Sequence, residues 1–533
     1  MIKLANHIHF MSEKLLKKDA LDYHSSGRKG KIEVIPTKPY TSQRDLSLAY
    51  SPGVAEPCLS INKNIDNVYK YTAKGNLVAV ISNGTAVLGL GDIGPEASKP
   101  VMEGKGLLFK IFADIDVFDI EVNETDVEKF IATVKAISPT FGGINLEDIK
   151  APEAFIIEER LKEELDIPIM HDDQHGTAII SSAALINALE IAKKKIGKVK
   201  IVVSGAGASA QSCLRLYISL GVKKENIFMF DSKGLLHESR KSSLDENKRF
   251  FMQKGPNLSL NEAFKKADVF LGLSKGGIVN EQMIKSMSKN PIVFALANPN
   301  PEIEYDLALK TRDDVIMATG RSDHPNQVNN VLGFPYIFRG ALDVRATKIN
   351  EDMKLAAVKA IALLAKEPVP DVVNEAYDAK SISFGRTQII PKPLDPRLIY
   401  WVAPAVAKAA MDSGVAKKPI KDWGKYESEL MERLGLNNKL IRNLTDKAKR
   451  NPKKVVFAEA DHYKILKAAE MALEEGIAIP ILLGKRQKIQ KIIDEYNLDL
   501  SNCEIIDPRN ESELKHREGF AEILHEKRKR RGL

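Results

Sequence analysis

The sequence is poor in the features that mark secreted, disulfide-bonded and membrane-spanning proteins. It holds only three cysteines in 533 residues, at Cys58, Cys213 and Cys503, and this wide spacing excludes a disulfide framework and a CxxC metal or redox motif. The apolar runs fall short of a membrane span, and the N-terminal MIKLANHIHFMSEKLLKK lacks the apolar core of a signal peptide. We therefore expect a cytoplasmic protein that has no membrane partner.

Aromatic residues are also scarce, at 6% of the chain, and the formal net charge is +8. Much of this charge comes from a basic run near the C-terminus, Lys527 to Arg531. A basic run can contact nucleic acid, but aromatic residues between the charges and a recognised nucleic-acid-binding motif are both missing. The run therefore predicts a solvated helix end and no nucleic-acid partner.

Short β-rich runs alternate with helical stretches and with turns that contain glycine or proline, which predicts an α/β fold. We expect an N-terminal α/β domain over residues 1–160 and a Rossmann-type dinucleotide-binding domain, with a doubly wound parallel sheet, over residues 161–420. A partial α/β domain is expected over residues 421–533. A long apolar helix is predicted from Thr177 to Ile191.

Two pairs of acidic residues stand out because no basic residue directly adjoins them: Glu147 with Asp148, and Asp172 with Asp173. Adjacent carboxylates repel, so a fold that brings both pairs together needs a cation or protons between them. Mg²⁺ or Mn²⁺ takes such oxygen ligands and keeps positions open for water or substrate. In the alternative interpretation, Asp173 caps the following helix and Glu147 and Asp148 are solvated.

A glycine-rich turn follows the apolar run IVVS and precedes a helix-like segment. Its pattern, G-x-G-x-x-A, is typical of dinucleotide binding, because glycine lets the backbone approach a pyrophosphate at a helix N-terminus. The predicted cofactor contacts are Gly205, Ala206, Gly207, Ala208, Ser209 and Ala210. A glycine turn that only packs a helix in some other α/β protein is the alternative.

The choice of cofactor depends on residues further along the chain. Asp231 follows at the distance expected of an acid that binds the adenine-ribose hydroxyl, which favours NAD. Lys233, Arg240 and Lys248 form a cationic group that would pair with a 2′-phosphate, which favours NADP. We expect NADP, with NAD possible.

A series of motifs makes the sequence similar to malic enzymes, specifically to the long bacterial NADP-dependent form with a phosphotransacetylase-like C-terminal extension. They are, in order, YSPGVAEP, GLGDIG with EGK, NLEDIKAP, HDDQHGTA, GAGASA, LANPNPEI and RSDHPNQVNNVLGFPYIFRG. The resemblance implies oxidative decarboxylation of (S)-malate to pyruvate and CO₂, with reduction of NADP, a requirement for Mg²⁺ or Mn²⁺, and a homo-oligomer.

The same resemblance implies roles for individual residues. Tyr50 would be the general acid and Lys105 the general base, with Asp172 beside the lysine to hold it and relay its proton. Taken singly, Tyr50 could be packed in a turn and Lys105 solvated in a loop. The remaining implied contacts are Glu147, Asp148 and Asp173 to the metal ion, Asn298 near the nicotinamide, and Asn330 at the malate carboxylate.

Two features depart from the wider family pattern. Ala86 stands where eukaryotic malic enzymes carry an arginine that grips the substrate carboxylate, so the sequence does not identify that cation. The C-terminal segment resembles only the opening of a phosphotransacetylase domain, so we expect no transferase activity. Two rival functions are an amino-acid dehydrogenase, which uses no metal, and a non-catalytic metabolite-binding protein.

Overall fold

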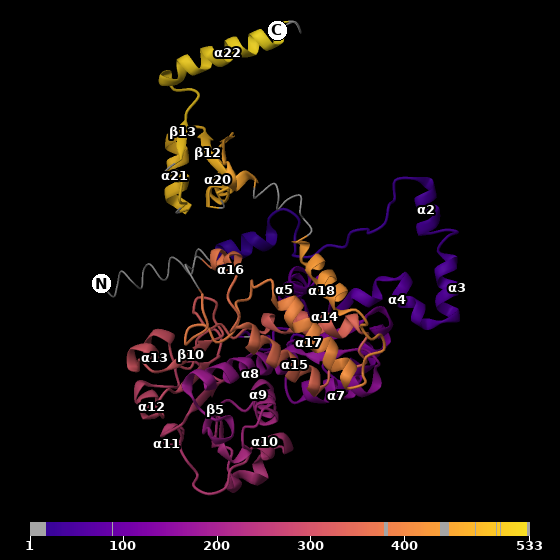
Figure 1. Ribbon diagram of the computed structural model, residues 1–533, viewed down its shortest axis with the longest axis vertical. Helices are drawn as coiled ribbons and strands as arrows, with labels where there is room; N and C mark the ends of the chain where they lie inside the picture. The colour runs from indigo at the N-terminus through magenta and orange to yellow at the C-terminus, as the bar shows by residue number, and fades with distance from the viewer. Residues whose placement is uncertain are drawn as a thin grey trace. The chain divides into compact units, whose positions relative to one another are not determined.

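The computed structural model describes residues 17–87, 89–377, 382–436, 447–474, 476–496, 498–500 and 503–529 (Figure 1). The chain divides into two compact units, Met1–Leu434 and Gly435–Leu533. Arg530 and Arg531 of the basic run lie outside the described residues.

A parallel sheet forms the first half of the first unit. Its strands are β1 (Leu77–Ser82), β2 (Asp116–Glu121), β3 (Gly143–Leu146) and β4 (Ile169–His171), in the order β2-β1-β3-β4. Helices α5 (Pro95–Ala113), α6 (Val127–Ile137) and α7 (Glu153–Glu164) connect them. Every residue of β1, LVAVIS, is buried, as expected of a central strand with both faces covered.

A second sheet lies further along the chain, with the order β10-β9-β8-β5-β6-β7. Its strands are β5 (Ile201–Ser204), β6 (Ile227–Asp231), β7 (Gly234–Leu235), β8 (Val269–Gly272), β9 (Ile292–Ala295) and β10 (Ile316–Thr319). All pairs are parallel except β6 with β7. The strand order reverses beside β5, which is the switch point where doubly wound sheets bind ligands. The predicted α/β, Rossmann-type fold is confirmed.

Short helices accompany the second sheet, and Figure 1 shows several of them beside β5 and β10. They are α9 (Ala208–Ser219), α10 (Glu246–Phe250), α11 (Leu260–Phe264), α12 (Glu281–Ser286) and α13 (Tyr305–Thr311). A separate buried cluster on this sheet includes Phe264, Phe270 and Ile284.

The long helix α8 (Asp172–Ala192) joins the two sheets and packs on α9 and on α15 (Glu351–Leu364). It begins at Asp172 and not at the predicted Thr177, since acidic residues in a first turn are stabilised by the helix dipole. The helix α8 is long and apolar enough to cross a membrane, but its most apolar stretch is 72% buried inside the protein, as in a core helix.

Three further helices complete the core of the first unit: α14 (Phe334–Asp343), α17 (Leu398–Asp412) and α18 (Trp423–Met431); α16 (Asp371–Ala376) is shorter. The Phe109 ring on α5 meets the Phe334 ring edge-on, with 4.8 Å between centroids, so α14 packs against α5. The first unit ends at Leu434, and Tyr426 and Leu430 on α18 are buried in it.

The segment before the first sheet is different, because its helices α2 (Gln43–Ala49), α3 (Ala55–Lys63) and α4 (Val68–Tyr71) contain no buried residue. In Figure 1, α2 and α3 lie away from the sheets of the first unit. Large apolar side chains here are exposed, among them Leu46 at 57% and Leu48 at 63%. The described segment therefore presents apolar surface that the other described residues leave exposed.

The second unit contains a small parallel sheet, β11 (Lys453–Phe457), β12 (Ala478–Leu483) and β13 (Glu504–Ile506), in that order. The helices are α20 (Tyr463–Glu474), α21 (Arg486–Tyr496) and α22 (Leu514–Arg528). Leu466, Leu482 and Ile489 form the centre of its core. The predicted βαβ pattern is present, and α22, which carries the start of the basic run, buries no residue.

Candidate active site

The acidic pairs lie at the carboxyl ends of two neighbouring strands. Glu147 and Asp148 directly follow β3, while Asp172 and Asp173 form the first turn of α8, directly after β4. Because β3 and β4 pair in parallel, their carboxyl ends meet at one edge of the sheet. The first sheet thus brings together two acidic pairs from separate parts of the sequence.

The Lys105 ammonium lies among these acids. Its Nζ is 2.8 Å from Oδ2 of Asp172 and 2.9 Å from Oε1 of Glu147. It also lies 4.4 Å from the centroid of the Phe334 ring. Burial alone would lower the pKa of Lys105, but the negative charges of Asp172 and Glu147 outweigh it and raise that pKa. Lys105 is therefore a buried ammonium in this state and not the solvated loop lysine of the alternative.

Glu147, Asp148 and Asp173 form a three-acid cluster. One carboxylate oxygen from each lies within 4.8 Å of the others. Burial, with the charges of Asp173 and Asp172, raises the pKa of Glu147 to about 8, and burial, with the charge of Asp148, raises that of Asp173 to about 7. Such convergence of hard oxygen donors, two from buried residues and one from the half-buried Asp173, fits a divalent cation, because the charge of the cation would offset this repulsion.

Backbone geometry fixes the cluster. The Asp148 N–H donates to Oδ2 of Asp173 over 2.8 Å, and Asp148 adopts the left-handed conformation with φ of 54°. This conformation costs free energy for a residue with a side chain, so surrounding contacts must hold it. The bond joins the two segments that supply the acids.

Asn330 approaches the same site from η7 (Asn330–Leu332). Its Nδ2 donates to Oδ2 of Asp172 over 3.1 Å, and its Oδ1 accepts from Thr177 Oγ1 at 3.0 Å. Gly176 permits this approach, since a methyl group there would overlap the Asp172 carboxylate and the Asn330 amide. The structure thus joins Asn330, Asp172 and Lys105 in one hydrogen-bonded chain.

Sequence analysis missed a buried network behind the acids. Glu158 on α7 accepts from the His171 N–H at 3.0 Å, pairs with His175 Nε2 at 3.0 Å and pairs with Lys162 Nζ at 2.5 Å. Lys354 Nζ on α15 lies 3.2 Å from His175 Nδ1. The network ties the first turn of α8 to α7 and α15.

Asn145 and Phe334 were missed as well. Asn145 is fully buried, and its Nδ2 donates to Oε2 of Glu147 over 2.8 Å. His175 in HDDQH was a sequence signal for the network, because a histidine ring can bond through both nitrogens. His171 ends β4 and joins the network through its backbone N–H. No comparable signal marked Asn145, an ordinary polar residue in a strand, or Phe334, whose partner Lys105 comes from a distant part of the chain.

The predicted glycine turn lies at the carboxyl end of β5. Gly205 has φ of 109°, and a side chain there would also overlap the Leu273 carbonyl. Gly207 is the N-cap of α9, and nothing lies within 4 Å of where its Cβ would stand. Ala210 is buried beneath the turn. This open backbone at a helix N-terminus suits a pyrophosphate.

Of the residues predicted to choose the cofactor, Asp231 ends β6 and Lys233 follows it, whereas Lys248 lies on α10. Arg240 pairs with both carboxylate oxygens of Asp231, at 2.9 and 2.7 Å, and the Lys233 N–H donates to Oδ1 of Asp231 at 2.8 Å. Lys248 Nζ lies 3.4 Å from Asp245.

Asn298 is exposed in the loop after β9.

Among the predicted catalytic residues, Tyr50 lies apart from the cluster. It caps the C-terminus of α2 and its side chain is 77% exposed. Its hydroxyl makes no hydrogen bond to any side chain in the described part of the chain. The packed-turn alternative for Tyr50 does not match this exposure.

Together, a Rossmann-type sheet with an open glycine turn and a second parallel sheet carrying a buried lysine and clustered acids define the class: a nucleotide-dependent α/β oxidoreductase. Residues 29–162 match the malic enzyme N-terminal domain and residues 174–376 match the malic enzyme NAD-binding domain. The chain belongs to the malic enzyme family. Residues 439–533 match the phosphate acetyl/butaryl transferase family.

Individual relatives agree with this assignment. The NADP-dependent malic enzyme of Salmonella typhimurium is 53% identical over 97% of this chain and 68% of its own length. That of Halomonas elongata is 58% identical over 75% of this chain and 94% of its own length. The crystal structure of the malic enzyme from Pyrococcus horikoshii aligns with a TM-score of 0.72 and 43% identity, covering 81% of this chain and 99% of that one.

Proposed function

We propose that this protein oxidatively decarboxylates (S)-malate to pyruvate and CO₂ while reducing NADP. The observation that carries the proposal is the Lys105 ammonium, 2.8 Å from Asp172 and beside the three-acid cluster. The Salmonella relative, an NADP-dependent malic enzyme, supports the same reaction.

Glu147, Asp148 and Asp173 are proposed to hold Mg²⁺ or Mn²⁺, which supplies a Lewis acid for the oxygen on C2 of malate. Their oxygen donors suit both ions. The fit rests on three convergent acids, two of them buried, and not on any one of them.

Lys105 is proposed to take the malate hydroxyl proton as hydride leaves C2 for the nicotinamide. A lysine acts as a base only when its pKa falls toward neutrality. The negative charges of Asp172 and Glu147 raise the pKa of Lys105 and keep it protonated here. Neutralising the charge of Glu147 would therefore lower the pKa of Lys105. Asp172 is proposed to accept a hydrogen bond from the Lys105 ammonium and to relay its proton. Asn330 is proposed to contact the malate carboxylate.

Tyr50 is proposed to deliver the proton to C3 after CO₂ leaves. Its exposure, on helices that bury no residue, leads us to propose a homo-oligomer in which Tyr50 of one copy completes the site of another. The exposed Leu46 and Leu48 would then be covered by the second copy.

NADP is the proposed cofactor, bound at Gly205 to Ala210, with Asn298 near the nicotinamide. Both oxygens of Asp231 already accept hydrogen bonds from Arg240, so Asp231 offers less to a ribose hydroxyl than an unpaired acid would. Arg240 and Lys233 leave positive charge there for a 2′-phosphate.

We further propose that residues 1–160 bind the substrate, residues 161–420 bind the cofactor and residues 421–533 form a partial phosphotransacetylase-like domain. The three free cysteines suit the reducing cytoplasm, where we place the protein.

One assay tests reaction, cofactor and metal together: the rate of NADPH or NADH formation from malate, with Mn²⁺ present or chelated. NADPH formation that stops with chelator supports the proposal. Turnover that persists without metal, with an amino acid and not with malate, would indicate an amino-acid dehydrogenase. Tight NADP binding without any turnover would indicate a metabolite-binding protein.

A further inference from the structure

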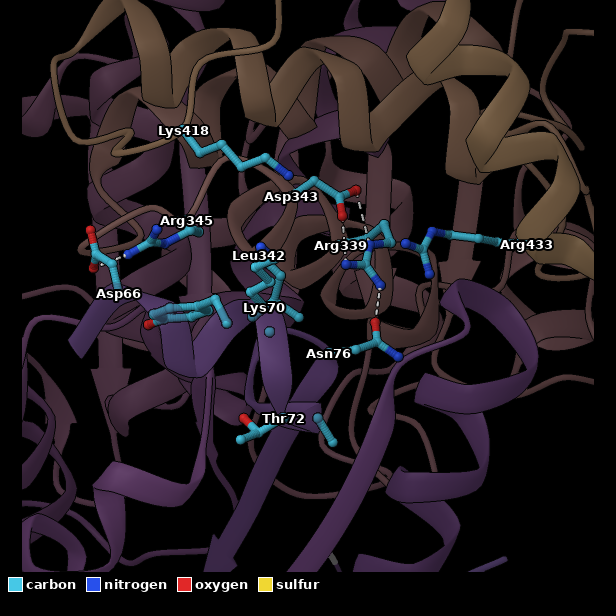
Figure 2. A pocket seen from close by; sticks show the side chains of 13 residues that line it. Asp66, Lys70, Thr72, Asn76, Arg339, Leu342, Asp343, Arg345, Lys418 and Arg433 are labelled. Carbon is cyan, nitrogen blue, oxygen red and sulfur yellow. Dashed lines mark hydrogen bonds and ion pairs between the residues drawn. The ribbon is translucent and has the colours of Figure 1, made fainter. Parts of the chain in front are cut away.

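A cavity of about 530 Å³ opens in the first unit, at a place that the proposed reaction does not use. Figure 2 shows its walls, which come from residues 66–76, from the C-terminal half of α14 with Arg345, and from Lys418 and Arg433. Among the described residues that line it, none belongs to the three-acid cluster or to the glycine turn. Its volume falls in the range of metabolite pockets.

Positive charge dominates the cavity, because its lining includes five basic side chains and two acidic ones. Both acids are already engaged. The Arg339 guanidinium, 1% exposed, pairs with Asp343 through Nε at 3.0 Å and Nη2 at 2.6 Å. Arg345 Nη2 pairs with Asp66 at 2.6 Å.

The remaining cations lack such partners. Within the described residues, no carboxylate lies within ion-pair distance of Lys418 or Lys70, and Arg433 reaches only Asp114, at 3.3 Å, outside the lining. In Figure 2 the Lys418 and Arg433 side chains point inward toward the Arg339–Asp343 pair. Charges of one sign that converge in a concave site attract counter-ions of the other sign.

Arg345 adds a donor that is not used. Its Nε–H is buried and finds no hydrogen-bond partner in the part of the chain that the structure describes. Its guanidinium carbon lies 4.0 Å from the centroid of the Tyr69 ring, which holds the group in one plane. Leaving a buried charged donor unsatisfied is costly, so a ligand acceptor would stabilise this arrangement.

We infer that this cavity binds a small polyanion, one that carries phosphate or several carboxylate groups. The unpaired ammonium of Lys418, with the Arg433 guanidinium and the Arg345 Nε–H, would supply charge-assisted hydrogen bonds to its oxygens. Arg339, held by Asp343, lies beneath them as a fixed part of the wall.

Helix α14 connects this cavity to the catalytic lysine. Its first residue, Phe334, lies under the Lys105 ammonium at 4.4 Å, and its last, Asp343, lines the cavity. The two ends are about 15 Å apart at the usual rise per residue of an α-helix. A ligand bound in the cavity therefore lies against the far end of the helix that packs against the catalytic lysine.

Calorimetry of the full chain in metal-free buffer tests the site, with pyrophosphate as the phosphate probe and citrate as the carboxylate probe. We expect saturable binding of at least one probe, with the tighter one identifying the ligand chemistry. The double variant Lys418→Gln/Arg433→Gln should weaken that binding by about tenfold or more. Lys408→Gln, an exposed lysine on α17 outside the cavity, is the matched control.

Absence of saturable binding by both probes, or equal binding by wild type and the double variant, would overturn the site. The coupling is tested separately through the malate dependence of the rate, which rests on the proposed function, whereas calorimetry does not. A probe that shifts this dependence in wild type and not in the double variant supports coupling. Binding without any shift would refute the coupling and leave the site standing.

Discussion

The Lys105 Nζ lies 2.8 Å from Oδ2 of Asp172, an acid with no exposed surface at the first residue of α8. The pair is held from three sides, by Glu147 at 2.9 Å, by the Phe334 ring and by the Asn330 amide. These contacts fix the position of Lys105, the proposed base, before the substrate binds. The proposed acid–base chemistry depends on that arrangement.

Replacing the base should abolish most turnover without unfolding the protein. We expect Lys105→Ala to lower kcat by about 10²-fold or more, the usual contribution of a positioned base. Small amines added to the variant should restore part of the rate, which a merely structural lysine would not show. Lys129→Ala, on the exposed face of α6, is the control. Wild-type turnover in Lys105→Ala would refute the assigned role.

Removing one acid from the three-acid cluster should weaken metal binding. Asp173→Asn keeps the shape of the side chain but loses its charge. The Mn²⁺ concentration for half-maximal rate should therefore rise at least about tenfold, because even the loss of a residue that only hydrogen-bonds to a metal ligand weakens metal binding by that much. Glu159→Gln, an exposed acid on α7, should leave the Mn²⁺ titration unchanged. An unchanged titration in Asp173→Asn would exclude Asp173 as a ligand.

Tyr50 should act across copies of the chain. Tyr50→Phe and Lys105→Ala should each be nearly inactive, but co-expressed chains should form hybrids in which one site holds both native residues. A dimer would then recover about a quarter of wild-type activity, by the statistics of random pairing in a symmetric assembly. Recovery no greater than the sum of the two variants would mean that Tyr50 serves its own chain, or serves none.

Arg240 should influence the choice between the two cofactors. Because the proposed role is an ion pair with the 2′-phosphate, Arg240→Ala should raise the KM for NADP by about tenfold or more. The KM for NAD should change much less, since NAD lacks that phosphate. Lys254→Ala, an exposed cation nearby in the sequence, is the control. Equal effects on both cofactors would point to a structural role for Arg240.

Cysteine reactivity should follow burial. Cys213 is buried, and burial raises the pKa of its thiol to about 12, so its reactive thiolate is nearly absent at pH 8. The exposed Cys58 should therefore react with iodoacetamide at that pH, and Cys213 only after unfolding, when its pKa returns to the ordinary range. Mass spectrometry of the labelled peptides measures both. Labelling of native Cys213 at the rate of Cys58 would contradict its burial.

The glycine turn and the acidic pairs could be predicted from sequence, because both depend on short-range chemistry. A turn with glycine after an apolar strand needs only the preference of the backbone at Gly205, and the acids follow strands whose ends a parallel sheet brings together. Asn145 and Glu158 could not be found in this way. Glu158 is an ordinary helix acid whose partner, the His171 N–H, comes from the next strand. Asn145 bonds to Glu147, two residues further on, but the burial of both depends on the sheet around them.

What the sequence alone determined was the α/β fold, the order of its motifs and the family they indicate, since local periodicity and spacing are written directly in the chain. Only the tertiary structure decided how Lys105 is charged, because its pKa depends on Asp172 and Glu147, which reach it from two other elements. The structure alone also revealed the exposure of Tyr50 and the cationic cavity that Lys418 lines. Burial and charge at a point in space arise from all the segments that meet there, and no single stretch of sequence contains them.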